Sequence, residues 1–213
     1  MLRLVHRLTA LIVLIFLAVH ISHHLSGIFG VEFYNDLQKK LRLVYRNPFV
    51  EPLIIGAVIV QLIIGVVLWV KSLMRQNPRG FWSWLQIISG ALIFLTVSQH
   101  LTAHFLARVD QGLDTTFYWP LSVMDGPPFI YYFAPYYFLM VASVFAHAGA
   151  GLRYILMDRG REKLADLVGI GFIIFGLGAG VMIDLILAQV FFTAELPPEW
   201  VEYLRLYAPD YAR

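Results

Sequence analysis

Cysteine is absent from the 213 residues of this chain. Its absence excludes disulfide bonds, thiolate-ligated iron–sulfur clusters, cysteine-ligated zinc and covalently attached haem. A redox centre would therefore need histidine, methionine or oxygen ligands, or would bind non-covalently. Charge is also scarce, because Asp, Glu, Lys and Arg make up 14% of the residues and the formal net charge is +2. No basic run indicates a nucleic-acid partner.

Apolar residues take the place of the missing charge. They make up 59% of the chain, whose mean hydropathy is +0.70. Soluble domains are about half apolar, so the excess indicates lipid as the solvent. Five apolar segments each reach the roughly 20 residues that cross a bilayer as a helix, the only plausible form here. They are residues 4–29, 52–74, 81–107, 129–157 and 167–192.

These segments predict an all-α integral membrane protein with five transmembrane helices. We expect one transmembrane domain over residues 1–213, with residues 193–213 as an extramembrane tail. The first apolar segment is too long for a cleavable signal and lacks a small-residue cleavage site, so we expect it to be retained. The chain carries no phosphate-binding loop, nucleophile triad or paired carboxylates. At most we expect a non-catalytic or quinone-reactive subunit of an oxidoreductase, and we assign no catalytic residue.

The charges of the loops favour an N-terminus in the cytoplasm. The loop 109–128 has three Asp and no Lys or Arg, which fits the outer side. The inner side would receive Arg3, Arg7, Lys71, Arg75, Arg79, Arg153, Arg159, Arg161 and Lys163. The first outer loop argues the other way with Lys39, Lys40, Arg42 and Arg46. Its apolar residues recur at helical spacing, which predicts an interfacial helix whose cations reach to lipid headgroups.

Histidines interrupt the first and third apolar segments. His20 and His24, in LAVHISHHLSG (17–27), are four residues apart and share one helix face, as do His100 and His104. A single membrane histidine often bonds only a neighbouring carbonyl, but four at matching depth and spacing favour a cofactor. Facing imidazoles on two helices are what bis-histidine haem ligation needs. We predict His20 and His100 as axial ligands of the haem iron, with His24 and His104 close to the haem.

A short repeat supports this pairing of helices. LIFLAVH (14–20) recurs as LIFLTVSQH (92–100). A repeat of helices one and two by helices three and four indicates a four-helix core with the fifth helix outside it. The small residues Ser26, Gly27 and Gly90 would leave room for a flat ring.

In helix number, order and histidine placement, the chain resembles the cytochrome b membrane anchor of succinate dehydrogenases and fumarate reductases, in its five-helix, single-polypeptide form. The matching stretches are LAVHISHH, VSQHLTAH and FAHAGAGLR, which contain His20, His100 and His147. In that family helices one and three hold an outer haem, and helices two and four an inner one. The resemblance implies haem b, a membrane quinone, peripheral flavoprotein and iron–sulfur subunits, and a bacterial inner membrane.

The second helix departs from that family. In VIVQLIIGVVLWVK, Gln61 stands where the two-haem pattern has histidine, and an amide is a poor haem ligand. We therefore expect a divergent member with one haem b and a degenerate second site of Gln61 and His147. His147 would then be an orphaned ligand, a partner of Gln61 or part of a quinone pocket. A quinone could also find hydrogen-bonding groups near the starts of helices one and three, in His6, Arg7, Ser83 and Gln86.

Two other hypotheses stay open. His20, His24, His100 and His104 could hold a non-haem metal, if their nitrogens converge within about 2–2.3 Å of one point. Alternatively, the protein could be a cofactor-free scaffold that kept the fold, in which case side chains would fill the gap beside His20 and His100. Asp184 in the fifth segment is expected to be paired, protonated or part of a polar route, because a membrane carboxylate is costly.

Overall fold

The computed structural model describes residues 2–74 and 80–211, which are helical without any strand. Five helices are long and apolar enough to span a membrane, which confirms the predicted all-α, five-span fold. Arg75, Arg79 and the side chain of Arg3 lie outside what is described. The elements are α1 (Leu2–Leu25), η1 (Ser26–Phe29), α2 (Val31–Tyr45), α3 (Val50–Leu73), α4 (Phe81–Phe105), the π-helical η2 (Leu106–Asp110), α5 (Tyr118–Ser122), α6 (Ile130–Met157), α7 (Glu162–Leu187) and α8 (Pro198–Arg205).

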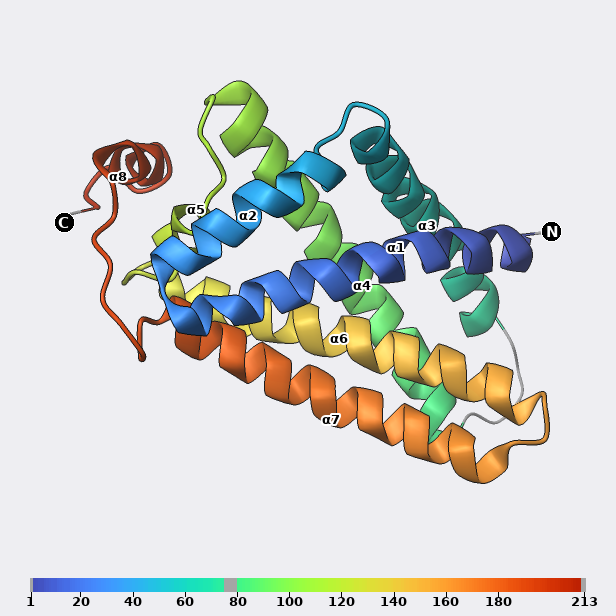
Figure 1. Cartoon of the computed structure of the whole chain (residues 1–213). Coiled ribbons are helices and arrows are strands. Elements are labelled where there is room, and N and C mark those ends of the chain that lie inside the picture. The colour runs from blue at the N-terminus through green and yellow to red at the C-terminus, as the bar shows by residue number, and fades with distance from the viewer. Residues whose placement is uncertain (1, 75–79, 212–213) are drawn as a thin grey trace.

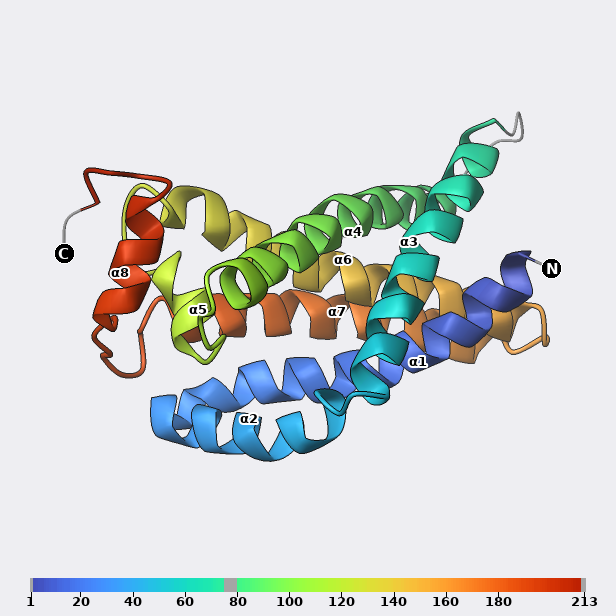
Figure 2. The same cartoon turned by 90° about the horizontal axis from the view of Figure 1, so that it is seen from above.

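The long helices form a ring, in which α1 packs against α3 and α7, α4 against α3 and α6, and α6 against α7. The two cartoons show α6 and α7 side by side, with the N-terminus and α8 at opposite ends of the molecule (Figures 1 and 2). Glycines allow the close approach of α6 and α7. A Cβ on Gly176 would lie 2.5 Å from the Cβ of Phe145, and one on Gly149 would lie 2.6 Å from the Cβ of Phe172.

Helix α7 lies earlier in the chain than the apolar pattern indicates, because it runs from Glu162 to Leu187 rather than over 167–192. Its first turns carry charged residues that an apolar pattern does not detect. Beyond its end, Gln189 adopts a positive φ of 59°. The Gln189 side-chain oxygen accepts a hydrogen bond from the Ala194 amide at 2.5 Å, which holds the chain in its new direction.

The first outer loop does form the predicted helix. Helix α2 folds back along α1 toward the start of α3 (Figure 2). Lys39 and Lys40 are exposed, but Arg42 and Arg46 bind the segment 112–117. The expectation that all four cations reach to headgroups is therefore wrong for these two arginines. The acidic outer loop lies close enough to bind them instead.

The C-terminal segment packs at the same end of the molecule as α2. Trp200 and Leu204 of α8 are buried, and Trp200 contacts the cluster around Ala107 and Trp119. The tail thereby supports the loop between α4 and α6. This loop carries an aromatic side chain, Trp119, into the lining of the central space.

Candidate cofactor site

A cavity of about 2000 Å³ occupies the centre of the helical ring. Typical small-molecule sites measure roughly 300–1,000 Å³, so this space can hold a large cofactor and a second ligand. Most of its lining is apolar and comes from α1, α3, α4 and α6. Helix α7 closes the ring between α6 and α1 and contributes Ile183 and Leu187 to the described lining, so the prediction of a fifth helix outside a four-helix core does not describe its place.

His20 and His100 both line this cavity, and their ring centres are 6.3 Å apart with the ring planes at 75°. They come from α1 and α4, which are not neighbours in the ring of helices. A metal–imidazole bond of about 2 Å on each side, together with the two half-rings, requires ring centres about 6 Å apart. Neither ring makes a hydrogen bond within residues 2–74 and 80–211. The pair therefore fits bis-histidine ligation of a haem iron, and the scaffold hypothesis, which predicts a filled gap, does not fit.

His24 lies directly behind His20, with a ring-centre distance of 4.6 Å. The hydroxyl of Tyr34 lies 3.2 Å from Nδ1 of His24. Tyr34 also contacts His23, because Nε2 of His23 lies 3.1 Å from the backbone carbonyl oxygen of Tyr34. Phe16 stacks on His20 from the preceding turn at 5.1 Å. These contacts hold the α1 histidines in place from two sides.

Trp119 performs a similar role for α4. Its ring centre lies 5.1 Å from that of His100 and 5.2 Å from that of His104. His104 therefore lies beside His100 against the same tryptophan, as His24 lies beside His20 against Tyr34. Within the described part of the chain, no group of three or more His, Asp or Glu side chains is arranged to hold a metal ion. The geometry therefore gives the four-histidine metal hypothesis no support.

Gln61 is not hydrogen-bonded to His147. Its Nε2 donates to the backbone oxygen of His6 at 2.5 Å and to Oγ1 of Thr9 at 2.8 Å, which joins α3 to α1. His147 is instead bonded by α4. Nε2 of Gln86 lies 2.9 Å from Nε2 of the imidazole and 3.2 Å from its Nδ1.

Ser89 adds a second polar group, with its Oγ 3.2 Å from Nδ1 of His147. Gly90 allows His147 to pack closely against α4, since a Cβ on Gly90 would lie 3.3 Å from Cε1 of His147. The other predicted space-maker, Gly27, has a different role. A Cβ on Gly27 would lie 2.8 Å from Cγ2 of Ile186, so this glycine allows packing against α7 and makes no room for a cofactor.

The four predicted quinone residues, His6, Arg7, Ser83 and Gln86, all line the same cavity, at the end where α1 and α4 begin, here called the inner end; the opposite end, at α2, is called the outer end. Two buried atoms there, Nδ1 of His6 and Oε1 of Gln86, lack a hydrogen-bond partner in the residues described. Buried polar atoms without partners are uncommon and costly. The inner end can therefore offer both a ring nitrogen and a carbonyl oxygen to a ligand.

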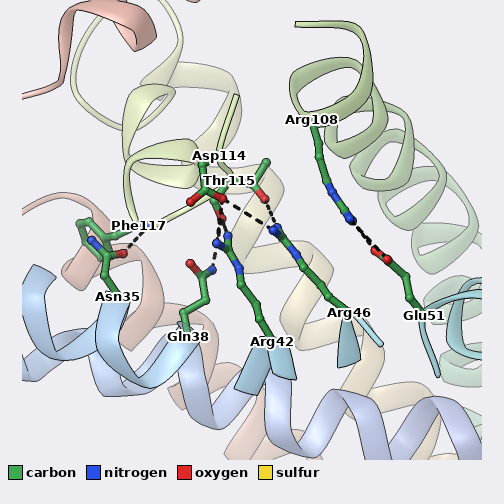
Figure 3. A network of polar contacts seen from close by, with 9 residues as sticks. All are labelled: Asn35, Gln38, Arg42, Arg46, Glu51, Arg108, Asp114, Thr115 and Phe117. Carbon is green, nitrogen blue, oxygen red and sulfur yellow. Dashed lines mark hydrogen bonds and ion pairs between the residues drawn. The ribbon is translucent and has the colours of Figure 1, made fainter. Parts of the chain in front are cut away.

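At the outer end, α2 is fastened to the segment 112–117 by side-chain bonds, here called the outer polar network (Figure 3). Arg42 Nη1 donates to Oδ1 of Asp114 at 2.7 Å, and Arg46 Nη2 donates to Oγ1 of Thr115 at 2.8 Å. Gln38 donates to the Thr115 carbonyl oxygen at 3.2 Å. Nearby, Arg108 pairs with Glu51 through both guanidinium nitrogens.

Asp184 is half-buried on α7 and is not among the lining residues described. Its Oδ1 has no hydrogen-bond partner in the described residues. The sequence thus located an intramembrane carboxylate, but it missed Trp119, Tyr34 and Ser89. A tryptophan followed by proline in an otherwise irregular loop was the one available signal for Trp119.

A family model of the succinate dehydrogenase/fumarate reductase transmembrane subunit matches residues 67–180, more than half of the chain. The matched region contains α4, α6 and three of the histidines discussed, His100, His104 and His147. His20 and Gln61 precede it. No curated protein and no solved structure shows significant similarity to the chain.

Proposed function

Because the chain belongs to the family of succinate dehydrogenase/fumarate reductase transmembrane subunits, we propose that it is a membrane anchor that holds one haem b. It would pass electrons between a peripheral dehydrogenase and membrane quinone. The flavin and the iron–sulfur clusters would belong to other subunits, because this chain has no cysteine to ligate a cluster.

The observation that carries the proposal is the pair His20 and His100, whose ring centres lie 6.3 Å apart in the lining of the cavity and whose rings make no hydrogen bond to any described residue. Neutral imidazoles without other partners are suited to ligate iron. A bound haem supplies reversible one-electron transfer at a potential that ligands and burial set. Tyr34 contacts His24, and Trp119 packs against both His100 and His104, so these two aromatic residues would hold the ligand histidines in position.

We assign the inner end of the cavity to quinone. A quinone head group carries two carbonyl oxygens that accept hydrogen bonds, and its reduced form carries two hydroxyls that donate them. Gln86, Ser89 and His147 form a mixed donor and acceptor surface there, and His6 adds an unpartnered ring nitrogen. Arg7 and Ser83 flank this surface in the cavity lining.

We place the protein in a bacterial inner membrane with its N-terminus in the cytoplasm. The acidic loop 109–128 supports this orientation, and the pairing of Arg42 with Asp114 offsets part of the contrary charge of the first outer loop. The inner end of the cavity then faces the side where the catalytic subunits dock. A quinone there would lie between those subunits and the haem.

The test is a reduced-minus-oxidised visible spectrum of the detergent-purified protein, with haem and metal content measured on the same sample. We expect about one low-spin b-type haem per chain. His20→Gly and His100→Gly should each abolish the low-spin spectrum, and added imidazole should restore it in part because the variants leave a ligand-sized space.

His147→Ala is the matched control, a buried imidazole of the same cavity that should keep the spectrum. Thermal unfolding of each variant in detergent separates ligand loss from misfolding. A wild-type protein without haem would overturn the proposal, and so would a low-spin haem that survives both His20→Gly and His100→Gly. About one zinc or copper per chain in its place would favour a non-haem metal site.

A further inference from the structure

Positive charge exceeds negative charge at the outer mouth of the cavity. Three arginines, Arg42, Arg46 and Arg108, lie there with two carboxylates, Asp114 and Glu51 (Figure 3). Arg108 has Glu51 to itself, and Arg42 binds Asp114 at 2.7 Å. Arg46 lies 3.6 Å from the same Asp114 oxygen. Within the described residues, therefore, no carboxylate pairs with Arg46 alone.

Arg46 is also the arginine of the outer polar network that lines the cavity. Its side chain is 22% exposed. His104, one turn beyond His100, lies within electrostatic reach of Arg46. The unmatched cation therefore faces the space beside the two facing histidines. The cations that line the other end, Arg7, Lys71 and Arg159, are all exposed.

A half-buried cation without its own anion is unfavourable, because desolvation is not offset by attraction. Burial, together with the neighbouring charges of Arg42 and Arg108, lowers the pKa of Arg46. The negative end of the α2 dipole, equivalent to about half a charge, offsets part of this cost because Arg46 directly follows the helix. An anion in the cavity would offset the rest.

We propose that Arg46 binds a propionate carboxylate of the haem held between His20 and His100. This inference rests on the proposed function. A guanidinium binds a carboxylate with two parallel hydrogen bonds, and Arg46 now spends one nitrogen on the neutral oxygen of Thr115. Tyr45 beside it lines the same cavity, and burial raises the pKa of its hydroxyl, which remains a donor.

The contact would also fix the orientation of the macrocycle. Its acidic edge would point to the outer end, toward α2, and its apolar edge toward the inner end. Helix α2 then has a purpose beyond connecting two spans, since its arginine completes the cofactor site. Arg42 supports this arrangement by neutralising Asp114, which otherwise competes for Arg46.

The test compares two cofactors in two proteins. Apoprotein in neutral detergent is reconstituted with haem b and with its dimethyl ester, in which both carboxylates are blocked. We expect the wild-type protein to prefer the free acid by about ten- to a hundredfold. In Arg46→Gln this preference should fall toward onefold. Lys39→Gln removes an exposed cation of the same helix and should keep the wild-type preference.

Two failures are distinguishable. Apoprotein that takes up neither cofactor overturns the proposed function and the inference together. Low-spin uptake of both cofactors with the same acid-to-ester ratio in wild type and Arg46→Gln overturns the inference alone. That result would assign the arginine to another anion, such as a lipid phosphate. The reduction potential gives a second readout, since loss of a nearby cation should lower it in Arg46→Gln and leave it unchanged in Lys39→Gln.

Discussion

The two ends of the central cavity both contain histidine, but they hold it differently. At the outer end the ring centres of His20 and His100 lie 6.3 Å apart, and neither ring makes a hydrogen bond within the described residues. At the inner end both ring nitrogens of His147 lie within hydrogen-bonding distance of neutral groups, Gln86 and Ser89.

The difference teaches how one cavity can separate two kinds of ligand. A ring whose nitrogens make no hydrogen bond within the described residues is available to a metal, whereas a ring in contact with an amide and a hydroxyl belongs to a hydrogen-bonding surface. The polar contacts follow the same division. The arginines of the outer end bind carboxylates, while Gln61 and Gln86 at the inner end bond neutral groups, although exposed cations also line that end.

The largest expected effect is on the ion pairs at the outer end of the cavity. In Glu51→Gln, Arg108 loses its carboxylate and is left beside Arg46. The Arg108–Glu51 pair is neither fully buried nor fully exposed. We therefore expect the free energy of unfolding to fall by about 1–3 kcal/mol, a value between those of surface and buried ion pairs. Thermal or denaturant unfolding in detergent measures the effect.

Asp36→Asn is the control for this prediction. Asp36 pairs with Lys39 on the exposed face of α2, at 3.1 Å. An exposed pair of this kind is worth less than about 1 kcal/mol, so the variant should unfold close to the wild type. Equal destabilisation by the two substitutions would mean that the outer polar network is no more than a surface feature.

The second prediction separates the functions of the two ends. His147→Ala should weaken binding of a quinone analogue about tenfold, because it removes one hydrogen-bonding group and takes from Gln86 the imidazole that it contacts. The haem spectrum should not change. Equilibrium binding of the analogue and a visible spectrum on one sample test both statements. His147→Asn, which keeps a polar group, should recover part of the affinity, and loss of haem from either variant would contradict the assignment.

Much of the fold could be predicted from local patterns. Apolar length identifies all five spans, and the four-residue spacing of His20 with His24 and of His100 with His104 selects the helix faces that meet across the cavity. The displaced helix α7 could not be predicted from apolarity, because its first turns are charged while its following segment is apolar yet turns away at Gln189.

Contacts that depend on helix rotation and on distant segments were not predictable. Gln61 occupies the expected depth but turns toward His6 and Thr9, and its sequence neighbours do not reveal that direction. Arg42 contacts Asp114 across more than 70 intervening residues. The prediction of membrane orientation rests on the charges of the loops. Only the tertiary structure shows that two of these charges are bound by other groups of the protein.

The smallest expected effect is the most direct comparison of the two ends. Gln61→His restores the residue that the two-haem pattern has on helix two, yet we expect haem content to stay at about one per chain. Position 61 faces the His6 carbonyl, and Gln86 and Ser89 already occupy the ring of His147. The free energy of unfolding should change by no more than about 1 kcal/mol, the value of a typical hydrogen bond. Haem per chain, measured on the purified variant, decides the matter.

A second low-spin haem in Gln61→His would mean that the inner end is a haem site lacking one ligand, and that its contacts with Gln86 and Ser89 yield readily to iron. An unchanged haem content would mean that the inner end differs from the outer one through its whole hydrogen-bonded surface, since one histidine would not suffice to convert it.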